Sequence, residues 1–598
     1  MSFIGFIYAN FWWIGKIFLK LFKHLESDIK AADMKIYPEA YASLIGFVFL
    51  IALIINSVFS ITLTILHISG ILSFLPSFLL VLVPVLSIVG IPFLLAFILA
   101  FIPVIAKYNR STRLNLESPY LAAYISTMAT GGVSPYISFE RLAKAPEYLF
   151  KEIRKEAVKF FINVKALGKD PLTAIEESAK NVPDRQYKEL MLGYAATLRT
   201  GGDVVHYLYR QTEVMFRDRI SQVRAIAERV GILMEAYMAV VVVLALSIYS
   251  IFIVNRALAQ AMLPLMSGAE FFLFSYVLMP MISALFIYLA DMMQPKYPTS
   301  DYRPYYVYFT VSLPITIALA ILLTLPFFMP ASNPIFAPYR KFIEDITLQF
   351  GLPPGFETGV GLSIAMISGL IPAWLATEYL MKEYKGVEFG ITRFLRDLVE
   401  VRKTGLSPEK CIINLSIRDY GKFSKHLDLI AKRIGWGMPL SNIYEDFAKK
   451  VKSWLARITM FLLTESIEVG GGTPETLESL ANFAEMIELV EREKRRILKP
   501  LIMIPYIGSI ITTLVVIILI AFMNNIMSIA RMSIAVVSLT RTFLPPIVLN
   551  SYITGLTAGK ISTEKVYGGF FHALLLVLTT LLTMAISPHI AQVLQFGA

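Results

Sequence analysis

Residues 485–524 read EMIELVEREKRRILKPLIMIPYIGSIITTLVVIILIAFMN. The first part is charged and has the spacing of a helix, and the part after Pro500 is an apolar run of the length that crosses a bilayer, about 20 residues. The stretch 203–254 has the same composition, with a charged helical pattern that leads into an apolar run. Both stretches therefore predict a long helix that leaves a polar domain and enters a membrane.

The composition of the whole chain points the same way. Hydrophobic residues make up 56% of the 598 residues and charged residues 17%, whereas soluble proteins have roughly 45–50% and 25%. Nine segments are long and apolar enough to span a bilayer: 41–66, 77–105, 231–254, 271–290, 305–329, 359–381, 501–524, 534–556 and 567–587. The sequence predicts an all-α, polytopic membrane protein.

Several classes of function are excluded by residue counts. The single cysteine, Cys411, rules out an intramolecular disulfide framework, and the six histidines lie too far apart in sequence to suggest a metal cluster. We expect no metal and no cofactor. The net charge of +11 is typical of cytoplasmic loops in a membrane protein, so we expect no nucleic acid partner.

Two long polar regions, 107–230 and 382–499, hold most of the 55 lysine and arginine residues. Because basic residues at span ends mark the inner side of a membrane, both regions are expected in the cytoplasm. Span parity then places the N-terminus inside and the C-terminus outside, with residues 330–358 as a Pro-rich outer loop. The basic residues at the four junctions are Lys107, Arg110, Arg113, Arg219, Arg224, Arg229, Lys382, Lys385, Arg492, Lys494, Arg495, Arg496 and Lys499.

Two segments leave alternatives open. Residues 1–40 begin with an apolar helix that carries Lys16, Lys20 and Lys23 on one face, which predicts a helix lying in the membrane interface, although a tenth span is the alternative. The span 534–556 contains Arg541, which is costly at the bilayer centre. Either Arg541 reaches an interface, or the span begins later, or the arginine is buried for a function.

The two polar regions resemble each other. The stretch Thr130–Pro135 recurs as Thr404–Pro408. In the same order, Gly168–Leu172 recurs as Gly437–Leu440, and Thr200–Asp203 recurs as Gly470–Thr473. The offsets between the copies are 273, 268 and 270 residues. Three ordered matches, each copy followed by a span, indicate an internal duplication.

Both copies read as compact bundles of about six short helices. Ser134, Asp170, Ser407 and Thr473 each precede a proline, a pair that caps a helix and starts its first turn. The glycines of the third motif predict left-handed helix ends, where one helix folds back on the next. The domains are expected at 1–40 (interfacial), 41–106 (two spans), 107–230 (first bundle), 231–381 (four spans), 382–499 (second bundle) and 500–598 (three spans).

The stretch EVGGGTPETLESLA that begins at Glu468 resembles the acidic–glycine motif of the type II secretion system F-domain family. The first copy lacks a glutamate before its glycines and has Arg199 there, which resembles the archaeal and tight-adherence branches of the family. The residues that carry the resemblance are Thr200, Gly201, Gly202, Asp203, Glu468, Gly470, Gly471, Gly472, Thr473 and Leu477. Nine spans depart from the bacterial pattern of about three and resemble the archaeal members.

The resemblance implies a non-enzymatic platform for assembling a type IV pilus-like filament, such as an archaeal pilus or archaellum. The implied partners are a cytoplasmic hexameric secretion ATPase, prepilin-like subunits and a second copy of the chain in a homodimer. Basic residues near the spans are candidate contacts with lipid headgroups or with the ATPase. These are Arg217, Arg219, Arg224, Arg229, Arg492, Lys494, Arg495 and Arg496.

Other functions fit less well. Residues 555–561, GLTAGKI, are one residue short of a phosphate-binding loop, lack the Ser or Thr after the lysine and border a span, so we reject nucleotide binding there. Glu465 and Glu468 suggest a solvated helix face more than a catalytic carboxylate pair. A secondary transporter with internal repeats remains the alternative, but its repeats would lie within the membrane.

Overall fold

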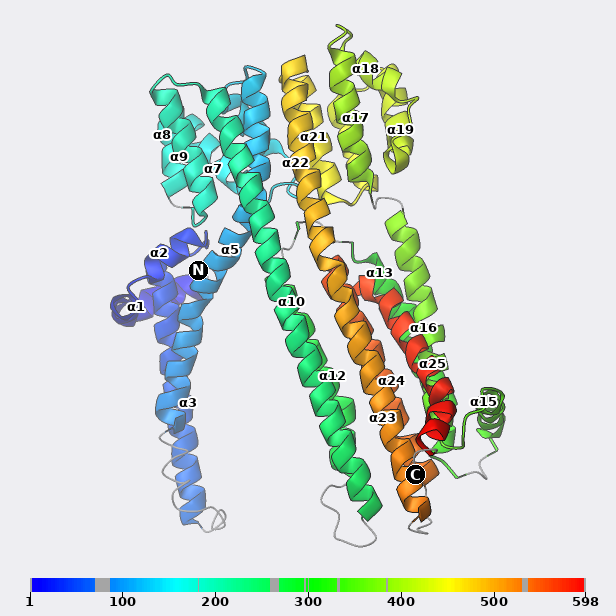
Figure 1. The fold of residues 1–598 in the computed structure, drawn as a ribbon. Coiled ribbons are helices and arrows are strands. Elements are labelled where there is room, and N and C mark those ends of the chain that lie inside the picture. The colour runs from blue at the N-terminus through cyan, green and yellow to red at the C-terminus, as the bar shows by residue number, and fades with distance from the viewer. Residues whose placement is uncertain are drawn as a thin grey trace. The chain divides into compact units, whose positions relative to one another are not determined.

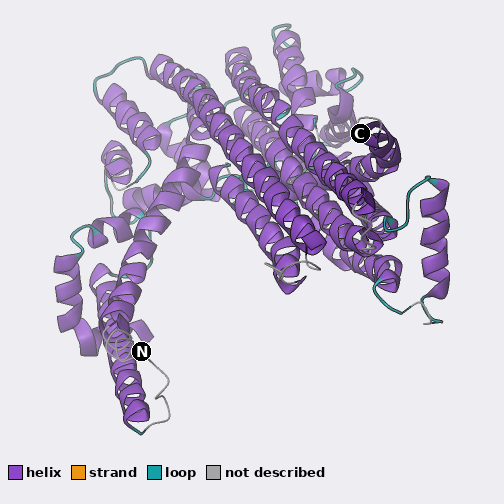
Figure 2. Ribbon diagram, turned by 60° about the horizontal axis from the view of Figure 1, so that its bottom comes forward, coloured by secondary structure: helices purple, strands orange, loops and turns teal. Residues whose placement is uncertain are grey.

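The computed structural model describes residues 3–69, 86–180, 182–258, 268–294, 297–298, 301–330, 334–382, 386–529 and 536–595. These residues form helices joined by turns and contain no strand (Figure 2), which confirms the all-α prediction. Residues 77–85 and 534–535 of two predicted spans, and Lys385, lie outside the described residues. The chain divides into two compact units, 1–215 and 216–598, and each is described by itself.

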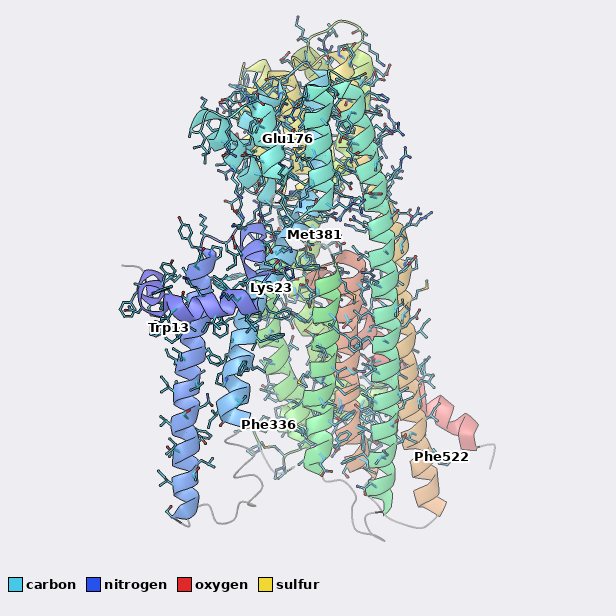
Figure 3. The ribbon with its side chains drawn as sticks, turned by 90° about the vertical axis from the view of Figure 1, so that its left-hand side faces the viewer. Trp13, Lys23, Glu176, Phe336, Met381 and Phe522 are labelled. Atoms are coloured by element: carbon cyan, nitrogen blue, oxygen red, sulfur yellow. The ribbon has the colours of Figure 1, made fainter. Side chains whose placement is uncertain are left out.

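Unit 1 begins with its membrane part. This part contains α1 (Phe3–Leu21), α2 (Leu25–Ala31), α3 (Pro38–Ile68), η1 (Leu86–Gly90) and the first half of α5 (Ile91–Thr130). The rings of Phe3 and Phe11 both pack on Phe47 of α3, and that of Phe18 packs on Phe49. Helix α1 leaves helical geometry at Phe11, and the part that follows this kink lies across α3, as Figure 3 shows between Trp13 and Lys23. The interfacial interpretation of residues 1–40 remains a prediction, with a tenth span as its alternative.

The first bundle follows in unit 1. It consists of the second half of α5, α6 (Pro135–Lys144), α7 (Glu152–Lys165), α8 (Pro171–Lys180), α9 (Arg185–Arg199) and the start of α10 (Val204–Leu258). Its core holds large aromatic side chains that are almost completely buried, among them Tyr124, Phe139, Phe160 and Tyr187.

The second bundle, in unit 2, repeats this order of six helices. It consists of α17 (Val387–Arg402), α18 (Pro408–Leu415), α19 (Ser424–Gly435, preceded by η5, Gly421–Phe423), α20 (Leu440–Lys450), α21 (Trp454–Glu468) and α22 (Pro474–Leu498). The expectation of about six helices per copy is therefore confirmed. All four predicted caps form: Ser134, Asp170, Ser407 and Thr473 each accept a hydrogen bond from the N–H three residues later.

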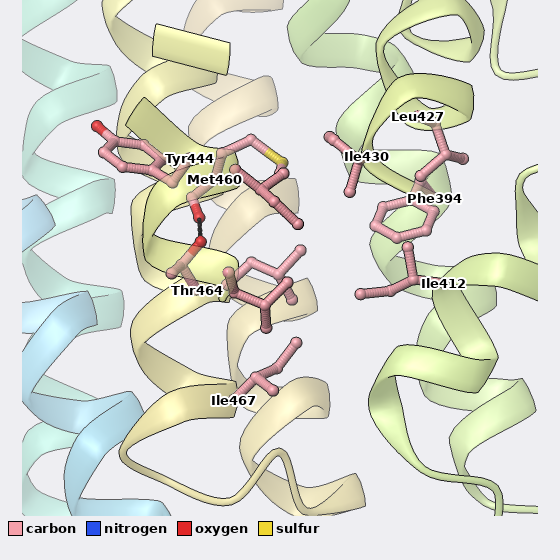
Figure 4. Close-up of a pocket in the computed structure, with 11 residues that line it drawn as sticks. Phe394, Ile412, Leu427, Ile430, Tyr444, Met460, Thr464 and Ile467 are labelled. Carbon is pink, nitrogen blue, oxygen red and sulfur yellow. Dashed lines mark hydrogen bonds between the residues drawn. The ribbon is translucent and has the colours of Figure 1, made fainter. Parts of the chain in front are cut away.

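The centre of the second bundle is closely packed. Figure 4 shows Phe394 and Leu427 on one side of the centre and Met460 and Ile467 on the other. The space between these side chains has a volume of about 10 Å³, which is room for a single water molecule at most. The interior of this bundle is thus a hydrophobic core and not a ligand site.

The membrane part of unit 2 surrounds α24. Its elements are the rest of α10, α11 (Gly268–Leu273), η2 (Phe274–Leu278), α12 (Met279–Met293), α13 (Arg303–Val307), η3 (Tyr308–Ser312), α14 (Leu313–Thr324), η4 (Leu325–Phe327), α15 (Ala337–Gln349), α16 (Glu357–Lys382), η6 (Pro500–Ile502), α23 (Met503–Ile529), α24 (Val536–Thr563), η7 (Val566–Gly568) and α25 (Gly569–Gln595). Helix α24 packs against α12, α16, α23 and α25. Residues 330–358, predicted as a loop, contain the helix α15 (Figure 1).

Eight helices of the described chain are long and apolar enough to cross a membrane. They correspond to eight of the nine predicted spans: Pro38–Ile65, Ser87–Thr130, Val204–Phe252, Gly268–Met293, Arg303–Phe327, Glu357–Arg402, Pro474–Phe522 and Val566–Ser587. The remaining prediction, 534–556, falls on α24, a helix of 28 residues that is not among the eight. Because α24 is enclosed by other helices, it does not need a fully apolar surface.

Arg541 lies one turn into α24, and its guanidinium is paired with Glu357. The Nε and Nη2 atoms donate to the carboxylate over 3.2 and 3.3 Å, and the guanidinium lies 5.4 Å from the centre of the Phe327 ring. Glu357 begins α16 and Phe327 ends η4, so this contact joins the ends of three elements. Of the alternatives for Arg541, the structure supports an arginine at an end of the spans.

The rejected phosphate-loop segment is a continuous part of α24 that packs closely on α25. A Cβ at Gly559 would lie 1.9 Å from the Cα of Gly569, and one at Gly555 would lie 2.2 Å from the Cα of Ala573. The pair Gly555/Gly559 is the small-xxx-small spacing that lets membrane helices approach closely. These glycines serve helix packing.

Candidate functional site: the glycine turns and the junction of the second bundle

The second glycine turn reverses the chain between α21 and α22. Gly471 and Gly472 have φ of +66° and +55°, a conformation that costs any other L-residue about 1–2 kcal/mol. The N–H of Gly472 donates to the carbonyl of Ser466 over 2.9 Å and so closes the end of α21. A Cβ at Gly472 would also lie 2.7 Å from the Cγ of Pro408. This glycine is therefore required by both conformation and space.

Glu468 of the motif caps a neighbouring helix. Its Oε1 accepts a hydrogen bond of 2.7 Å from the N–H of Ser441, in the first turn of α20. The N-cap residue of α20 is Pro439, whose side chain makes no cap hydrogen bond. Glu468 thus supplies, from the end of α21, an acceptor that the start of α20 lacks.

The first glycine turn has no such glutamate, and the fourth helix of its bundle is capped by a residue of its own. Helix α8, which corresponds to α20, has its own cap in Asp170, whose Oδ2 accepts from the N–H of Thr173 over 3.1 Å. Arg199 is the last residue of α9, as Glu468 is of α21, and it pairs with Glu176 of α8 over 3.0 Å. In both copies, therefore, the last residue of the fifth helix contacts the fourth helix. That residue is a glutamate in the second copy and an arginine in the first. Gly201 has φ of +67° and Asp203 caps α10 through the N–H of His206, 2.9 Å away.

One residue of the second turn was missed from the sequence. The Nε of Arg402 donates to the carbonyl of Gly472 over 2.9 Å, and its Nη1 donates to that of Leu406 over 2.8 Å. Arg402 therefore fastens the α17–α18 turn to the glycine turn. The sequence signal that could have indicated this role is the position of Arg402 in the last turn of α17. Leu477, by contrast, is buried in the core as the motif suggests.

The predicted contact residue Lys494 is buried, with 11% of its side chain exposed. Its Nζ lies 2.8 Å from Glu491 and 3.2 Å from Glu564, which follows α24. Burial disfavours the charged forms of Lys494 and Glu491. The carboxylates of Glu491 and Glu564 nevertheless hold the pKa of Lys494 well above its ordinary value, and Lys494 lowers the pKa of Glu491. This corrects the expectation of a surface contact, because Lys494 acts inside the protein.

Lys494 belongs to a polar junction network, which we define as Asp291, Tyr297, Glu491, Lys494, Lys560 and Glu564. The hydroxyl of Tyr297 donates to Glu491 over 2.8 Å. The Nζ of Lys560 lies 2.6 Å from Asp291 and also donates to the carbonyl of Glu564 over 2.7 Å. The network connects α22 of the second bundle with the ends of α12 and α24, which the sequence could not bring together.

The other predicted basic residues differ in their partners and in their exposure. Arg495 pairs with Glu388 over 3.1 Å, and Arg496 pairs with Glu493 over 2.9 Å. Arg224 of α10 reaches the same Glu493 over 2.8 Å and links the two long helices. Arg219 is buried and donates to Gln222, while Arg217 and Arg229 are exposed.

Arg492 lines an open groove of about 300 Å³ between α17 and α22. Arg393 and Arg396 of α17 line it as well, and Glu485 and Glu488 of α22 pair with Arg396 and Arg492. Of the predicted contact residues, Arg492 is the one that lines this groove, beside Arg393 and Arg396, which the sequence analysis did not single out.

A buried carboxylate organises the first bundle. Glu117, in the part of α5 that follows the span, accepts hydrogen bonds from the N–H groups of Lys151, Glu152 and Ile153 at the start of α7, over 2.9 to 3.3 Å. Burial raises the pKa of Glu117 to about 7 against the opposing effect of these three donors. Among the described residues, no group of three or more His, Cys, Asp or Glu side chains could hold a metal ion.

Residues 121–252 and 394–521 match the family model of type II secretion system (T2SS), protein F. The chain carries two domains of the type II secretion system protein F family. Each match begins within the first helix of a bundle and ends in the span that follows, so it covers the duplicated part of the chain.

An uncharacterized protein of Methanocaldococcus jannaschii is 21% identical over 416 residues, which are 65% of this chain. The chain spans 66% of that relative's length. No solved structure is significantly similar to the chain.

Proposed function

We propose that the protein is the non-enzymatic membrane platform of a type IV pilus-like assembly machine, an archaeal pilus or archaellum. The observation that carries the proposal is the continuity of each F domain with a membrane helix. The last helix of the first domain, α10, runs without a break for 55 residues into a span. The last helix of the second, α22, continues through η6 into α23.

The physical reason is the coupling of two compartments. A cytoplasmic motor cannot act directly on subunits whose helices are embedded in lipid. A helix that is shared between a polar bundle and a membrane span transmits a rigid-body movement from one to the other. The junction network supports this role in the second bundle, since Lys494 of α22 pairs with Glu564 behind α24 and Lys560 of α24 pairs with Asp291 of α12.

The proposed partners are a cytoplasmic hexameric secretion ATPase, prepilin-like subunits and a second copy of the chain, with both F domains in the cytoplasm. The groove of Arg393, Arg396 and Arg492 is the proposed docking place for the ATPase, because it presents guanidinium groups on two rigid helices. Arg217 and Arg229, which are exposed, are proposed contacts with lipid headgroups or the ATPase.

Reconstitution of the full chain in vesicles with its cognate ATPase tests the proposal. We expect the ATPase to bind the vesicles and to hydrolyse ATP faster than it does on empty vesicles. Deletion of either bundle should abolish recruitment and, in cells, filament assembly. Normal filaments in such a strain would refute the platform role, and solute uptake without any effect on the ATPase would favour the transporter alternative.

The docking groove has a matched test. The double variant Arg396→Glu/Arg492→Glu should weaken ATPase binding at least about tenfold, the equivalent of 1.4 kcal/mol. The control is Lys432→Glu on α19, an exposed cation that also has an acidic partner, Asp428, and lies outside the groove. Equal binding by all three proteins would remove the groove from the proposal and leave the platform function standing.

A further inference from the structure

Helix α15 is held against the spans by its inner face. Ile343 is completely buried in a cluster with Leu323, Phe327 and Ala365. Leu323 belongs to the span that ends at Phe327, and Ala365 lies eight residues after Glu357, the first residue of α16. Eight residues correspond to about 12 Å along a helix. The body of α15 is therefore level with apolar parts of its neighbouring helices.

An apolar stripe flanks the buried face of α15. Tyr339 and Phe342 are three residues apart in the helix, which places them on one face, and Ile335 lies in the turn that leads into it. Tyr339 is 38% exposed and Phe342 is 54% exposed. Lys341 and Asp345 are exposed on another face. The helix is thus amphipathic on the part of its surface that the protein leaves open.

A layer of charges marks the level at which the apolar spans end. Arg340 of α15 pairs with Glu344 over 2.9 Å, and its guanidinium lies 5.6 Å from the Phe327 ring. The Arg541–Glu357 pair lies against the same ring. Charged groups on α15, α16 and α24 therefore meet at the end of α16 that is farther from α17 and the second bundle (Figure 1).

We propose that α15 is an interfacial helix, seated in the leaflet on the side of the bilayer opposite the second bundle, with lipid as the partner of its apolar stripe. The depth of Ile343, the stripe of Tyr339 and Phe342, and the charged layer agree on this position. A helix of this kind buries its apolar face about 5–10 Å into the boundary between headgroups and acyl chains. In water the same stripe would be an exposed apolar patch next to the membrane.

Spin labelling of the full chain in lipid vesicles tests this position. Cys411 is the single cysteine and is buried, so Cys411→Ala provides the background. One label each is placed at Phe342→Cys, Tyr339→Cys and Asp345→Cys. Reference labels are Ile321→Cys, exposed on the α14 span, and Ile417→Cys, exposed on the second bundle. Collision rates are measured with oxygen, which concentrates in lipid, and with a water-soluble nickel chelate present on both sides.

We expect the labels at Phe342 and Tyr339 to collide more with oxygen, as at Ile321, and the label at Asp345 to show the reverse ratio, as at Ile417. If Phe342 and Tyr339 collide with the chelate as Ile417 does, the stripe lies in water and the proposal fails. If both are shielded from oxygen and chelate alike, protein covers the stripe, for example a second copy of the chain, and the proposal also fails. Because all three positions on α15 are exposed, the labels leave its packing intact.

Discussion

The N–H of Ser441 donates a hydrogen bond of 2.7 Å to the carboxylate of Glu468, which stands 27 residues later in the chain. The acidic residue of the F-domain motif therefore caps a neighbouring helix, and the glycines beside it turn the chain. In the first copy the corresponding helix is capped by Asp170, and Arg199 at the end of α9 pairs with Glu176 of that helix.

Replacing Glu468 should loosen the start of α20. We expect Glu468→Ala to destabilise that helix by about 1 kcal/mol, since a missing cap costs about 0.5–2 kcal/mol. Hydrogen exchange of the first-turn amides of α20 measures the effect. Glu445→Ala, an exposed change on the same helix, is the control. Arg199→Ala should leave the first turn of α8 protected, because Asp170 caps it. Equal exchange in wild type and Glu468→Ala would show that the hydrogen bond contributes nothing.

Removing the ammonium of Lys494 should have a much larger effect. Lys494→Met leaves Glu491 and Glu564 close together and buried, and breaking a buried pair costs about 3–5 kcal/mol. Chemical unfolding in detergent measures the loss. Arg496→Ala, two residues further on and 72% exposed, should cost less than about 1 kcal/mol.

The same cluster offers a rescue. The triple variant Glu491→Gln/Lys494→Met/Glu564→Gln removes the three charges around Lys494 together and should recover much of the stability lost in Lys494→Met. Because the pKa of Glu491 is lowered in the folded protein, the stability from its pair is present at neutral pH and is lost as the pH falls through that pKa. A loss in Arg496→Ala as large as in Lys494→Met would contradict the assignment of the network to the protein interior.

The close contact of α24 with α25 predicts that Gly559 tolerates no side chain. We expect Gly559→Ala to destabilise the protein by about 3 kcal/mol, because overpacking costs about 1–3 kcal/mol and here the obstacle is backbone. Gly435→Ala on α19 is the matched control, since nothing lies within 4 Å of its Cβ position. Alanine is a better helix former than glycine, so this control should be neutral or slightly stabilising. Melting temperatures of the purified variants decide the matter, and a Gly559→Ala protein as stable as the control would exclude the proposed helix contact.

The carboxyl of Glu117 predicts a pH dependence of the first bundle. Its pKa is raised to about 7 from an ordinary value of 4.5. The stability contributed by the protonated form is therefore fully present below about pH 4.5 and is lost as the pH rises through about 7, by up to about 3 kcal/mol at 1.36 kcal/mol per unit. Glu117→Gln should remove this dependence. The measurement is the protection factor of the amides of residues 151–153 between pH 4.5 and 8. A variant that keeps the wild-type slope would assign the titration to another group.

Much of the architecture could be read from the residues alone. Long apolar runs, Ser/Thr/Asp–Pro caps and glycine turns are local signals, so they predicted the spans, the four caps and the six helices of each bundle. The recurrence of these signals at nearly constant offsets predicted the duplication, which the two F-domain matches confirm. The domain boundaries and the partners remain predictions.

Only the tertiary structure decided which distant residues meet. Lys494 appeared as one basic residue in a surface cluster, because a one-dimensional pattern does not show that Glu564 lies 3.2 Å away. Arg541 appeared as an obstacle inside a span until Glu357 and Phe327 were found beside it. The segment 555–561 was correctly rejected as a phosphate loop, but its packing against α25 could not be foreseen. Local sequence sets the period, caps and turns of a helix, whereas burial and ion pairing depend on neighbours that belong to other helices.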